Sequence, residues 1–536
     1  VEEFNEFKQL ETKLDNGLSQ DEIKRYVELK EKSKKAELRS FISYTDPIFF
    51  YFLYAFIVGI YTMLGGFRAA AITDAIQGVL IIIFSAILIP VGLSKIGGFS
   101  GLHANVPDYM FELFGSATMS EYAWFTIAAM ALANLVSIVA VASSMQTAGS
   151  AKNEMTARVG MIGGMFTKRL IMILWALAGL IAIALYAKDL HDPDLIWGYM
   201  THNLLFPGAV GLMLIGILAA NMSSLDAGSV SYSALFIKNL YKPFVKEKSE
   251  SHYLFIGRIV IAITLLGGII VAMYVDNLLE LFKYIISIPA IFGASIWLGF
   301  IWRRVTKWAV ILQVVITILI YAVIPNLFQG LDYTKYHEDL LLETTPKTVT
   351  ITTSALVEDV NSGIADCIGE SIEKMHLIEP VGVFFEKVAR VDPSNPESSK
   401  IGLGRFHAEI WVLSWFGMDF SNYSKAELVT VRFLFDALFP FLLLFVFSYI
   451  TKPVSKPFLD RFFAKMHTPV QTTDEKEQQA LEDSFNNPEK FESDKLFPRT
   501  QWEIMKPSRM DLIGFGGSWV LVGVIILLLW LVVSIT

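Results

Sequence analysis

The sequence is almost without cysteine, and its histidines are few and scattered. A single cysteine, Cys367, among 536 residues allows no internal disulfide and no cluster of cysteine ligands. The eight histidines lack the spacing of a metal site, and neither a GxxxxGK[ST] phosphate loop nor an HExxH sequence is present. These absences leave no signature of a soluble enzyme.

Charged residues are also scarce, at 18% of the chain, whereas hydrophobic residues make up 54% and the mean hydropathy is +0.49. This composition is typical of a protein that crosses the lipid bilayer several times. The net charge of −8 gives no reason to expect a nucleic-acid partner. The given sequence does not open on a signal-peptide pattern. Because it opens on Val1 in a charged stretch, we expect an N-terminal piece to be missing.

Stretches of about 18 or more mostly apolar residues predict membrane-spanning helices, because such a helix is long enough to cross the hydrocarbon core. The sequence contains ten of them, and Pro289 inside the seventh predicts a kink, since proline removes a backbone donor. The ten windows are 47–64, 71–93, 122–143, 167–187, 206–237, 253–274, 281–301, 307–328, 428–450 and 511–535.

The short loops between these windows differ in charge. Those after the first, third, fifth and seventh windows carry twelve lysines and arginines in or beside them, and the alternate loops carry three. Positive charge collects on the cytoplasmic side of membranes, so the first set is predicted to be cytoplasmic. The twelve are Arg68, Lys152, Arg158, Lys168, Arg169, Lys238, Lys242, Lys246, Lys248, Arg303, Arg304 and Lys307, and the three are Lys95, Lys188 and Lys283.

This orientation divides the chain into six parts. The external insert after the eighth window contains TVTITTSALV (348–357), which has a strand-like pattern, and IADCIGESIEKM (364–375), which has a helical one. The acidic stretch 472–495 is expected to be flexible. The parts are an extracytoplasmic charged helical segment (1–46), a core of eight helices (47–328), the extracytoplasmic insert (329–427), a ninth helix (428–451), a cytoplasmic polar segment (452–510) and a C-terminal helix (511–536).

Two of the apolar windows contain clusters of polar residues, which are costly in hydrocarbon and therefore suggest function. One is GGFRAAAITDAIQG (65–78), in which Asp74 enters the second window. The other is LAANMSSLDAGSVSYS (218–233), which supplies hydroxyl groups and a carboxylate. Hydroxyl, carbonyl and carboxylate oxygens suit an alkali cation better than a transition metal. Together they predict a cation site of the kind that sodium-coupled carriers use.

These stretches resemble a known family. GGFRAAAITDAIQ resembles the Gly-Gly-x-x-Ala-x-x-x-Thr-Asp-x-x-Gln signature of the sodium:solute symporter family, and the run from Ala219 that contains Met-Ser-Ser resembles its second signature. QTAGSAKNEMTARVG (146–160) is similar to the family's Gln-Arg-x-x-x-Ala-Lys loop, with Thr147 where arginine is usual. The resemblance covers about 47–328 well and the last two helices loosely.

The resemblance implies an all-α polytopic membrane protein with ten helices here and a five-plus-five inverted-repeat, leucine-transporter-like core. It implies sodium-coupled symport of a small organic solute by alternating access, in the plasma membrane or a bacterial inner membrane. It also implies no enzyme activity and no cofactor beyond sodium as the coupling ion. In family terms the first window is the fourth core helix, so we expect the broken first core helix to lie outside this chain.

The family's sodium-ligand positions fall on the carbonyl of Ala220 and on the hydroxyls of Ser223 and Ser224. The competing interpretation is that these small residues permit close helix packing or bond to carbonyls one turn earlier. Asp74 matches a family acid linked to a second sodium ion or to ion release, and a salt bridge with Arg68 is its competing interpretation.

Two further residues are expected to take part. Asp226 departs from relatives that place serine there, so it is predicted as a sodium ligand, with proton acceptance and pairing with a lysine as alternatives. Asn134 falls on a position that faces the solute in sugar carriers, and an interhelical hydrogen bond is the alternative. Ile286 stands where those carriers have glutamine, which argues against a hexose.

Two other functions remain open from the sequence. A proton-coupled carrier of the same fold is one, because Asp74 and Asp226 can both exchange protons. A non-transporting sensor that uses the carrier fold is the other.

Overall fold

The structure is a computed structural model, and it describes most of the chain from residue 45 onward. The predicted charged helical segment 1–46 lies almost entirely outside the described residues, and so does the side chain of Arg68. The described residues are 45–113, 122–187, 190, 193–274, 278–356, 359–360, 362–367, 369–391, 398–471 and 473–535, together with single positions between 3 and 29.

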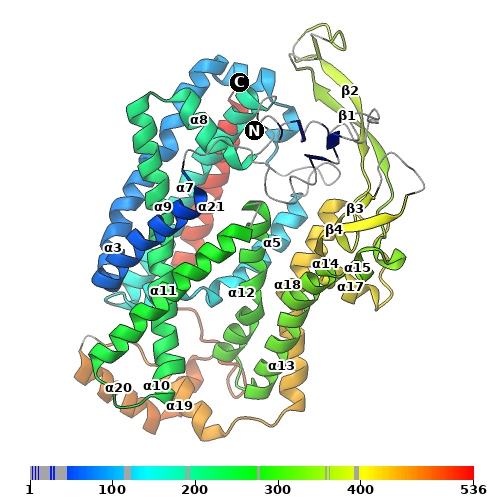
Figure 1. The fold of residues 1–536 in the computed structure, drawn as a ribbon. Coiled ribbons are helices and arrows are strands. Elements are labelled where there is room, and N and C mark those ends of the chain that lie inside the picture. Colours follow the sequence, from blue (N-terminus) through cyan, green and yellow to red (C-terminus); the bar gives the residue numbers. More distant parts are fainter. Residues whose placement is uncertain are drawn as a thin grey trace.

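One group of helices is built from α3 (Pro47–Ile96), α7 (Glu154–Tyr186), α9 (Pro207–Phe236) and α11 (Glu250–Tyr274). In this group α3 packs against α9 and α7, and α11 packs against α9 and α3 (Figure 1). α3 consists of two helices in sequence, because the left-handed backbone of Gly66 (φ 60°) interrupts it. The polar stretch with Asp74 therefore belongs to the second half of α3.

A second group contains α5 (Trp124–Ser137), α12 (Leu278–Ile301), α13 (Lys307–Ile318) and α18 (Lys425–Ile450). α12 packs against α5 and α18, and α18 packs in turn against α5 and α13. Pro289 lies inside α12, and the kink expected there stays a prediction. Buried Gln313 of α13 links this helix to α12, because its side chain donates to the Ile291 carbonyl at 2.8 Å and accepts from the Ser295 hydroxyl at 2.5 Å.

The third predicted window is a broken helix rather than a continuous one. α5 ends at Ser137 and a turn of 3₁₀ helix, η3 (Ile138–Ala140), follows. Val141 then has extended backbone (φ −80°, ψ 99°), and α6 (Ala142–Gly149) leaves at 59° to the helix before it. No proline or glycine marks this break, so the local sequence does not predict it. α6 packs against α7 and α9 and thereby touches the first group.

The described residues contain eight helices that are long and apolar enough to cross a membrane, or nine if α5 and α6 form one span. The window 281–301 falls on α12, whose side chains are described only from Ile288 onward. The expected number of ten is therefore not confirmed. The eight are Pro47–Gly66, Ala70–Ile96, Glu154–Tyr186, Pro207–Phe244, Glu250–Met273, Lys307–Gly330, Lys425–Ile450 and Arg509–Ser534, the last being α21.

The short helices that connect the spans lie at two opposite ends of the molecule. Figure 1 shows α10 (Lys242–Phe244), α19 (Lys456–His467) and α20 (Asp474–Asn486) together at one end of the molecule. α8 (Ile196–Leu204) lies at the opposite end, which is the end of the insert's first two strands. The first end is the one that the charge of the loops predicts to be cytoplasmic, and this orientation stays a prediction.

The insert contains two separate antiparallel sheets, so the fold is mostly helical rather than all-α. β1 (Lys347–Ser354) pairs with β2 (Ser371–Ile378), and β3 (Phe385–Arg390) pairs with β4 (Lys400–Phe406). The strand predicted at 348–357 is confirmed over its first seven residues. The helix predicted at 364–375 is wrong, because none of its described residues is helical. From Ser371 onward the chain forms β2 instead, since pairing with β1 takes up its backbone groups and overrides a weak local preference.

The insert packs onto the second group of helices through a shared apolar core and a buried ionic cluster. Phe385 and Phe406 belong to the same hydrophobic cluster as Tyr321 and Phe435 of the helices. In the ionic cluster Arg405 pairs with Glu409 at 2.9 Å, and Arg432 of α18 lies 3.0 Å from Nε2 of His407. The described part of the insert is thus continuous with the membrane core rather than a separate domain.

The polar segment 452–510, predicted to be cytoplasmic, is folded, which corrects the expectation of flexibility for 472–495. Its middle forms α20 and the 3₁₀ helix η8 (Pro488–Asp494). The side chain of Glu503 is fully buried and accepts from Lys495 at 2.7 Å and from Arg303, which follows α12. From composition alone, the many charged side chains of this segment are expected to be in water. In the structure some of them are buried, and the oppositely charged side chains of Lys495 and Arg303 neutralise Glu503.

Candidate functional site

The second half of α3 brings Asp74 against α9. The Ser223 hydroxyl of α9 lies beside the Asp74 carboxylate, although the two residues are far apart in the sequence. The Asp74 carboxylate oxygen Oδ1 is buried and has no hydrogen-bond partner within the described part of the chain. A buried acceptor of this kind is costly in a membrane unless a cation or a donor reaches it. The structure thus joins two of the predicted site residues around one unsatisfied oxygen.

Ala220 and Ser224 supply two more oxygens one helical turn apart. The Ser224 hydroxyl donates to the Ala220 carbonyl at 3.4 Å, which is near the limit for a hydrogen bond. This is the bond to the preceding turn that a simple packing role also predicts. The Ser224 side chain is nevertheless exposed at this point of α9. A long bond and an open side leave both oxygens accessible to an ion.

Asp226 is fully buried, and its two oxygens accept hydrogen bonds from different donors. Oδ2 accepts from the Tyr61 hydroxyl of α3 at 2.8 Å, and Oδ1 accepts from the backbone N–H of Ala227 at 2.5 Å. Both bonds come from within the α3–α9 pair, so pairing with a lysine is not the arrangement observed among the described residues. The carboxylates of Asp226 and Asp74 are close enough to repel each other.

Two glutamines bring further oxygens to this region. The side-chain oxygens of Gln77 and Gln146 are buried and make no hydrogen bond to the residues that the structure describes. Gln77 follows Asp74 by one turn of α3, and Gln146 belongs to α6, which packs against α9. Sequence reasoning does not single out either residue, nor Tyr61. The glutamines that close GGFRAAAITDAIQ and open QTAGSAKN are the signal that points to the first two.

Asn134 lies apart from these residues. It belongs to α5, which packs against α12 and α18, whereas the residues above belong to α3, α9 and, for Gln146, α6. Its side chain is exposed and makes no hydrogen bond to any described residue, so the interhelical bond is not found there. The structure thus leaves Asn134 in the second group of helices, facing outward from α5.

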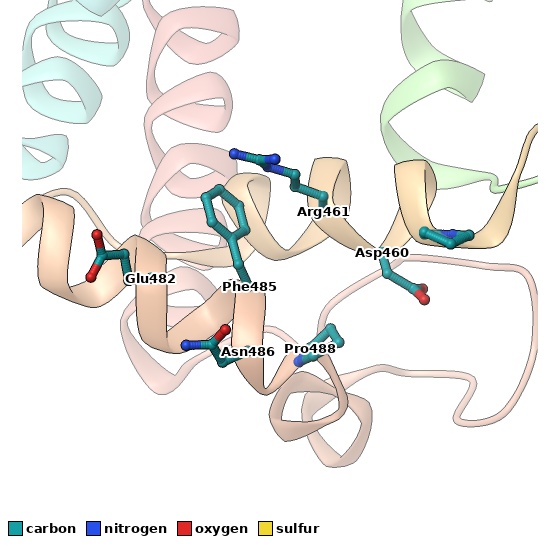
Figure 2. Close-up of a pocket in the computed structure, with 7 residues that line it drawn as sticks. Asp460, Arg461, Glu482, Phe485, Asn486 and Pro488 are labelled. Atoms are coloured by element: carbon teal, nitrogen blue, oxygen red, sulfur yellow. The ribbon is translucent and has the colours of Figure 1, made fainter.

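Two cavities differ in their relation to this region. A cavity of about 280 Å³ between α3, α7 and α9 is lined by Ala220 and Asn221 and by the indoles of Trp175 and Trp197. A cavity of about 710 Å³ lies between α19 and α20, outside the spans. Figure 2 shows Arg461 of the latter above the ring of Phe485, 4.8 Å from its centroid. Only the smaller cavity adjoins a predicted ligand.

The stretch from the start of α3 to the end of α13 matches a family model, that of the sodium:solute symporter family, over residues 42–322. This is more than half of the chain, and it contains Asp74, Asn134 and every predicted ligand on α9. The chain belongs to the sodium:solute symporter family. With its apolar helices, this makes it a multi-pass membrane protein.

Proteins that are named as transporters of different solutes are similar in sequence to this chain. The high-affinity proline transporter PutP of Bacillus subtilis is 28% identical over 282 residues, which are 50% of this chain and 58% of that protein. The sodium/pantothenate symporter of Haemophilus influenzae is 26% identical over 306 residues, 55% of this chain and 61% of its own. The sodium/glucose cotransporter 4 of Mus musculus is 26% identical over 284 residues, covering 44% and 39%. The chain thus spans about half the length of these relatives.

Proposed function

We propose that this protein moves a small organic solute across the membrane together with sodium, by alternating access. The observation that carries the proposal is the buried Oδ1 oxygen of Asp74. It lies next to the Ser223 hydroxyl of α9 and has no hydrogen-bond partner among the described residues. Family membership adds support, because the relatives include a sodium/pantothenate symporter and a sodium/glucose cotransporter. Transport changes no covalent bond, so neither enzyme activity nor a cofactor beyond the coupling ion is part of the proposal.

We assign sodium to the oxygens of Ala220, Ser223, Ser224 and Asp74, with Asp226 as a fifth candidate ligand. Each carboxylate oxygen of Asp226 accepts one hydrogen bond and has a second lone pair for a cation. Hard oxygen ligands without imidazole or thiolate favour an alkali cation over a transition metal. Sodium between Asp74 and α9 would also offset the repulsion of the two carboxylates.

The broken helix α5–α6 is the proposed moving part of the solute site. Carriers of this kind bind solute where a helix is interrupted, because the freed backbone groups at the break serve as ligands. The break lies between the two groups of helices, since α5 packs within the second group and α6 touches α9 of the first. Asn134 of α5 is the proposed solute contact. The five-plus-five repeat and the ten spans are part of this proposal.

The solute is proposed only as a small organic molecule. The relatives are named for proline, pantothenate and glucose, which differ in size and charge. Whichever solute is carried, sodium entry supplies the energy for its transport, since one positive charge that crosses the membrane contributes about 2.3 kcal/mol per 100 mV.

Uptake measured with sodium replaced by choline, at two pH values, tests the coupling ion. Loss of uptake without sodium at both pH values supports sodium coupling. Uptake that persists without sodium and follows the proton gradient instead supports the proton-coupled alternative, in which Asp74 and Asp226 exchange protons. Sodium binding without any transport, under the same conditions, supports a sensor.

A further inference from the structure

Two tyrosines of the first half of α3 reach across to α9. The Tyr54 hydroxyl donates to the Leu218 carbonyl at 3.0 Å. The Tyr61 hydroxyl donates to Asp226 Oδ2 at 2.8 Å and lies 3.5 Å from the Met222 carbonyl. Because Tyr54 and Tyr61 are seven residues apart, they lie on the same face of α3, two turns from each other. Together they contact three successive turns of α9.

The face of α9 that the tyrosines contact is adjacent to the face that carries Ser223. Leu218, Met222 and Asp226 recur every four residues, and successive residues of a helix are turned by about 100°. Ser223 therefore lies about 60° around the helix from Asp226, on the side that meets Asp74. A rotation of α9 that moved Asp226 away from Tyr61 would also move Ser223 relative to Asp74.

The bond from Tyr61 differs from the bond from Tyr54 in its acceptor. Tyr54 donates to a backbone carbonyl, whereas Tyr61 donates to a carboxylate that is fully buried. Hydrogen bonds to charged groups are about twice as strong as those between neutral groups. Removal of the Tyr61 hydroxyl would also leave a buried carboxylate oxygen without a donor. The position of α9 around Asp226 therefore depends more on Tyr61 than on Tyr54.

We propose that Tyr61 is a positioning residue of the sodium site, which holds α9 in the rotation that presents Ser223 to Asp74. The residue acts through Asp226 and does not itself touch the ion. This inference rests on the proposed sodium site. It adds a residue from the first half of α3 to a site whose other members come from the second half and from α9.

Replacement of Tyr61 by phenylalanine tests this role in the whole protein, with Tyr54→Phe as the matched control. Both changes remove one hydroxyl from the same face of the same helix. We expect Tyr61→Phe to raise the sodium concentration for half-maximal uptake about 3- to 30-fold, with less than a twofold fall in maximal rate at saturating sodium. We expect Tyr54→Phe to change the half-saturating sodium concentration by less than about twofold.

A double-mutant cycle with Asp226→Asn separates positioning from general stability. Because Tyr61 acts through Asp226, its replacement should have a much smaller effect on sodium dependence in the Asp226→Asn background than in the wild type. Equal effects in both backgrounds would overturn the proposal. It also fails if Tyr61→Phe lowers thermal stability and maximal rate while the half-saturating sodium concentration stays unchanged.

Sodium-dependent thermal stabilisation of the purified protein provides a readout that does not require transport. A weakened sodium site should shift the sodium dependence of the melting temperature in Tyr61→Phe and not in Tyr54→Phe. If the wild type shows no sodium dependence in either assay, the proposed function fails. If the wild type depends on sodium and the two variants behave alike, only the role of Tyr61 fails.

Discussion

The backbone carbonyl of Val136 lies where Gly293 would carry a side chain, since a Cβ on Gly293 would be 2.1 Å from the Val136 oxygen. Val136 lies just before the break between α5 and α6, and Gly293 lies in α12 after Pro289. The backbone of α12 at Gly293 thus lies against the backbone of α5 at the end that precedes the break. The geometry of the break depends on the absence of a side chain at this one position.

Replacement of Gly293 by alanine should destabilise the protein by about 1–3 kcal/mol, because the contact is with backbone that cannot rotate away. The melting temperature of the purified protein measures this. Gly299→Ala is the matched control, since a Cβ at Gly299 of the same helix meets no atom within 4 Å. Equal melting temperatures for the two variants would mean that α12 shifts freely, and the backbone contact would then carry no constraint.

Replacement of Ser224 by alanine removes one proposed ligand and should weaken the sodium site by about 1–3 kcal/mol, which is a five- to hundred-fold rise in half-saturating sodium. The maximal rate at saturating sodium should fall much less. Solute affinity should weaken at fixed sodium and recover as sodium rises, because the coupling between two ligands is reciprocal. Asp74→Asn should instead slow turnover more than it weakens sodium binding, since asparagine keeps a side-chain oxygen for the ion and the family acid that Asp74 matches is linked to ion release.

Ser231→Ala is the control for this change. The Ser231 hydroxyl donates to the Ala227 carbonyl at 2.7 Å, so it makes the same type of bond on the same helix without a proposed ion nearby. Its removal should leave sodium dependence unchanged. An unchanged sodium dependence in Ser224→Ala, at normal expression, would show that this hydroxyl only packs.

Cys367 provides a direct test of orientation, because it is the one cysteine in the sequence and it is exposed on the insert. A membrane-impermeant maleimide should label it in intact cells if the insert is extracytoplasmic. A Cys367→Ser protein with Ser455→Cys, in the predicted cytoplasmic segment, should be labelled only after permeabilisation. The reverse pattern would invert the predicted orientation of every span.

Glu503 should contribute strongly to the docking of the cytoplasmic segment. Glu503→Gln removes a buried charge that compensates both Lys495 and Arg303, and loss of one partner from such a buried pair costs about 3–5 kcal/mol. Proteolysis of the segment between α18 and α21 should accelerate accordingly. Asp483→Asn breaks the solvent-exposed pair with Lys490 in the same segment and should leave the cleavage rate unchanged.

The stability of the same segment should depend on pH through His467. Burial lowers the pKa of the His467 imidazole below the 6.5 of an unperturbed histidine; Lys495 and Arg303 act in the same direction, and Glu503 opposes them. The unfolded segment therefore binds the proton more readily, so stability is fully present above pH 6.5 and is lost as pH falls below it. Melting temperatures at pH 7.5 and 5.5 should differ less in His467→Gln than in the wild type. If the melting temperature changes equally between the two pH values in both proteins, His467 is not the cause of the pH dependence.

The sequence alone determined the apolar spans and the identity of the polar residues inside them. Apolar length is a local property, because a helix in hydrocarbon must satisfy its backbone internally and bury about 20 apolar residues whatever it packs against. Asp74, Ser223 and Ser224 could therefore be named from two short stretches. The resemblance to the family added which residues of the second stretch are expected to bind sodium.

Only the tertiary structure decided which groups become partners. The break at Val141 occurs without proline or glycine, and the strand at β2 and the helix at α20 replace the helix and the flexible stretch that local pattern predicts. Tyr61 donates to Asp226 across 165 positions of the chain. A hydrogen bond or ion pair between distant residues leaves no periodic trace in either segment, since its energy depends on burial and distance that exist only after the helices have packed.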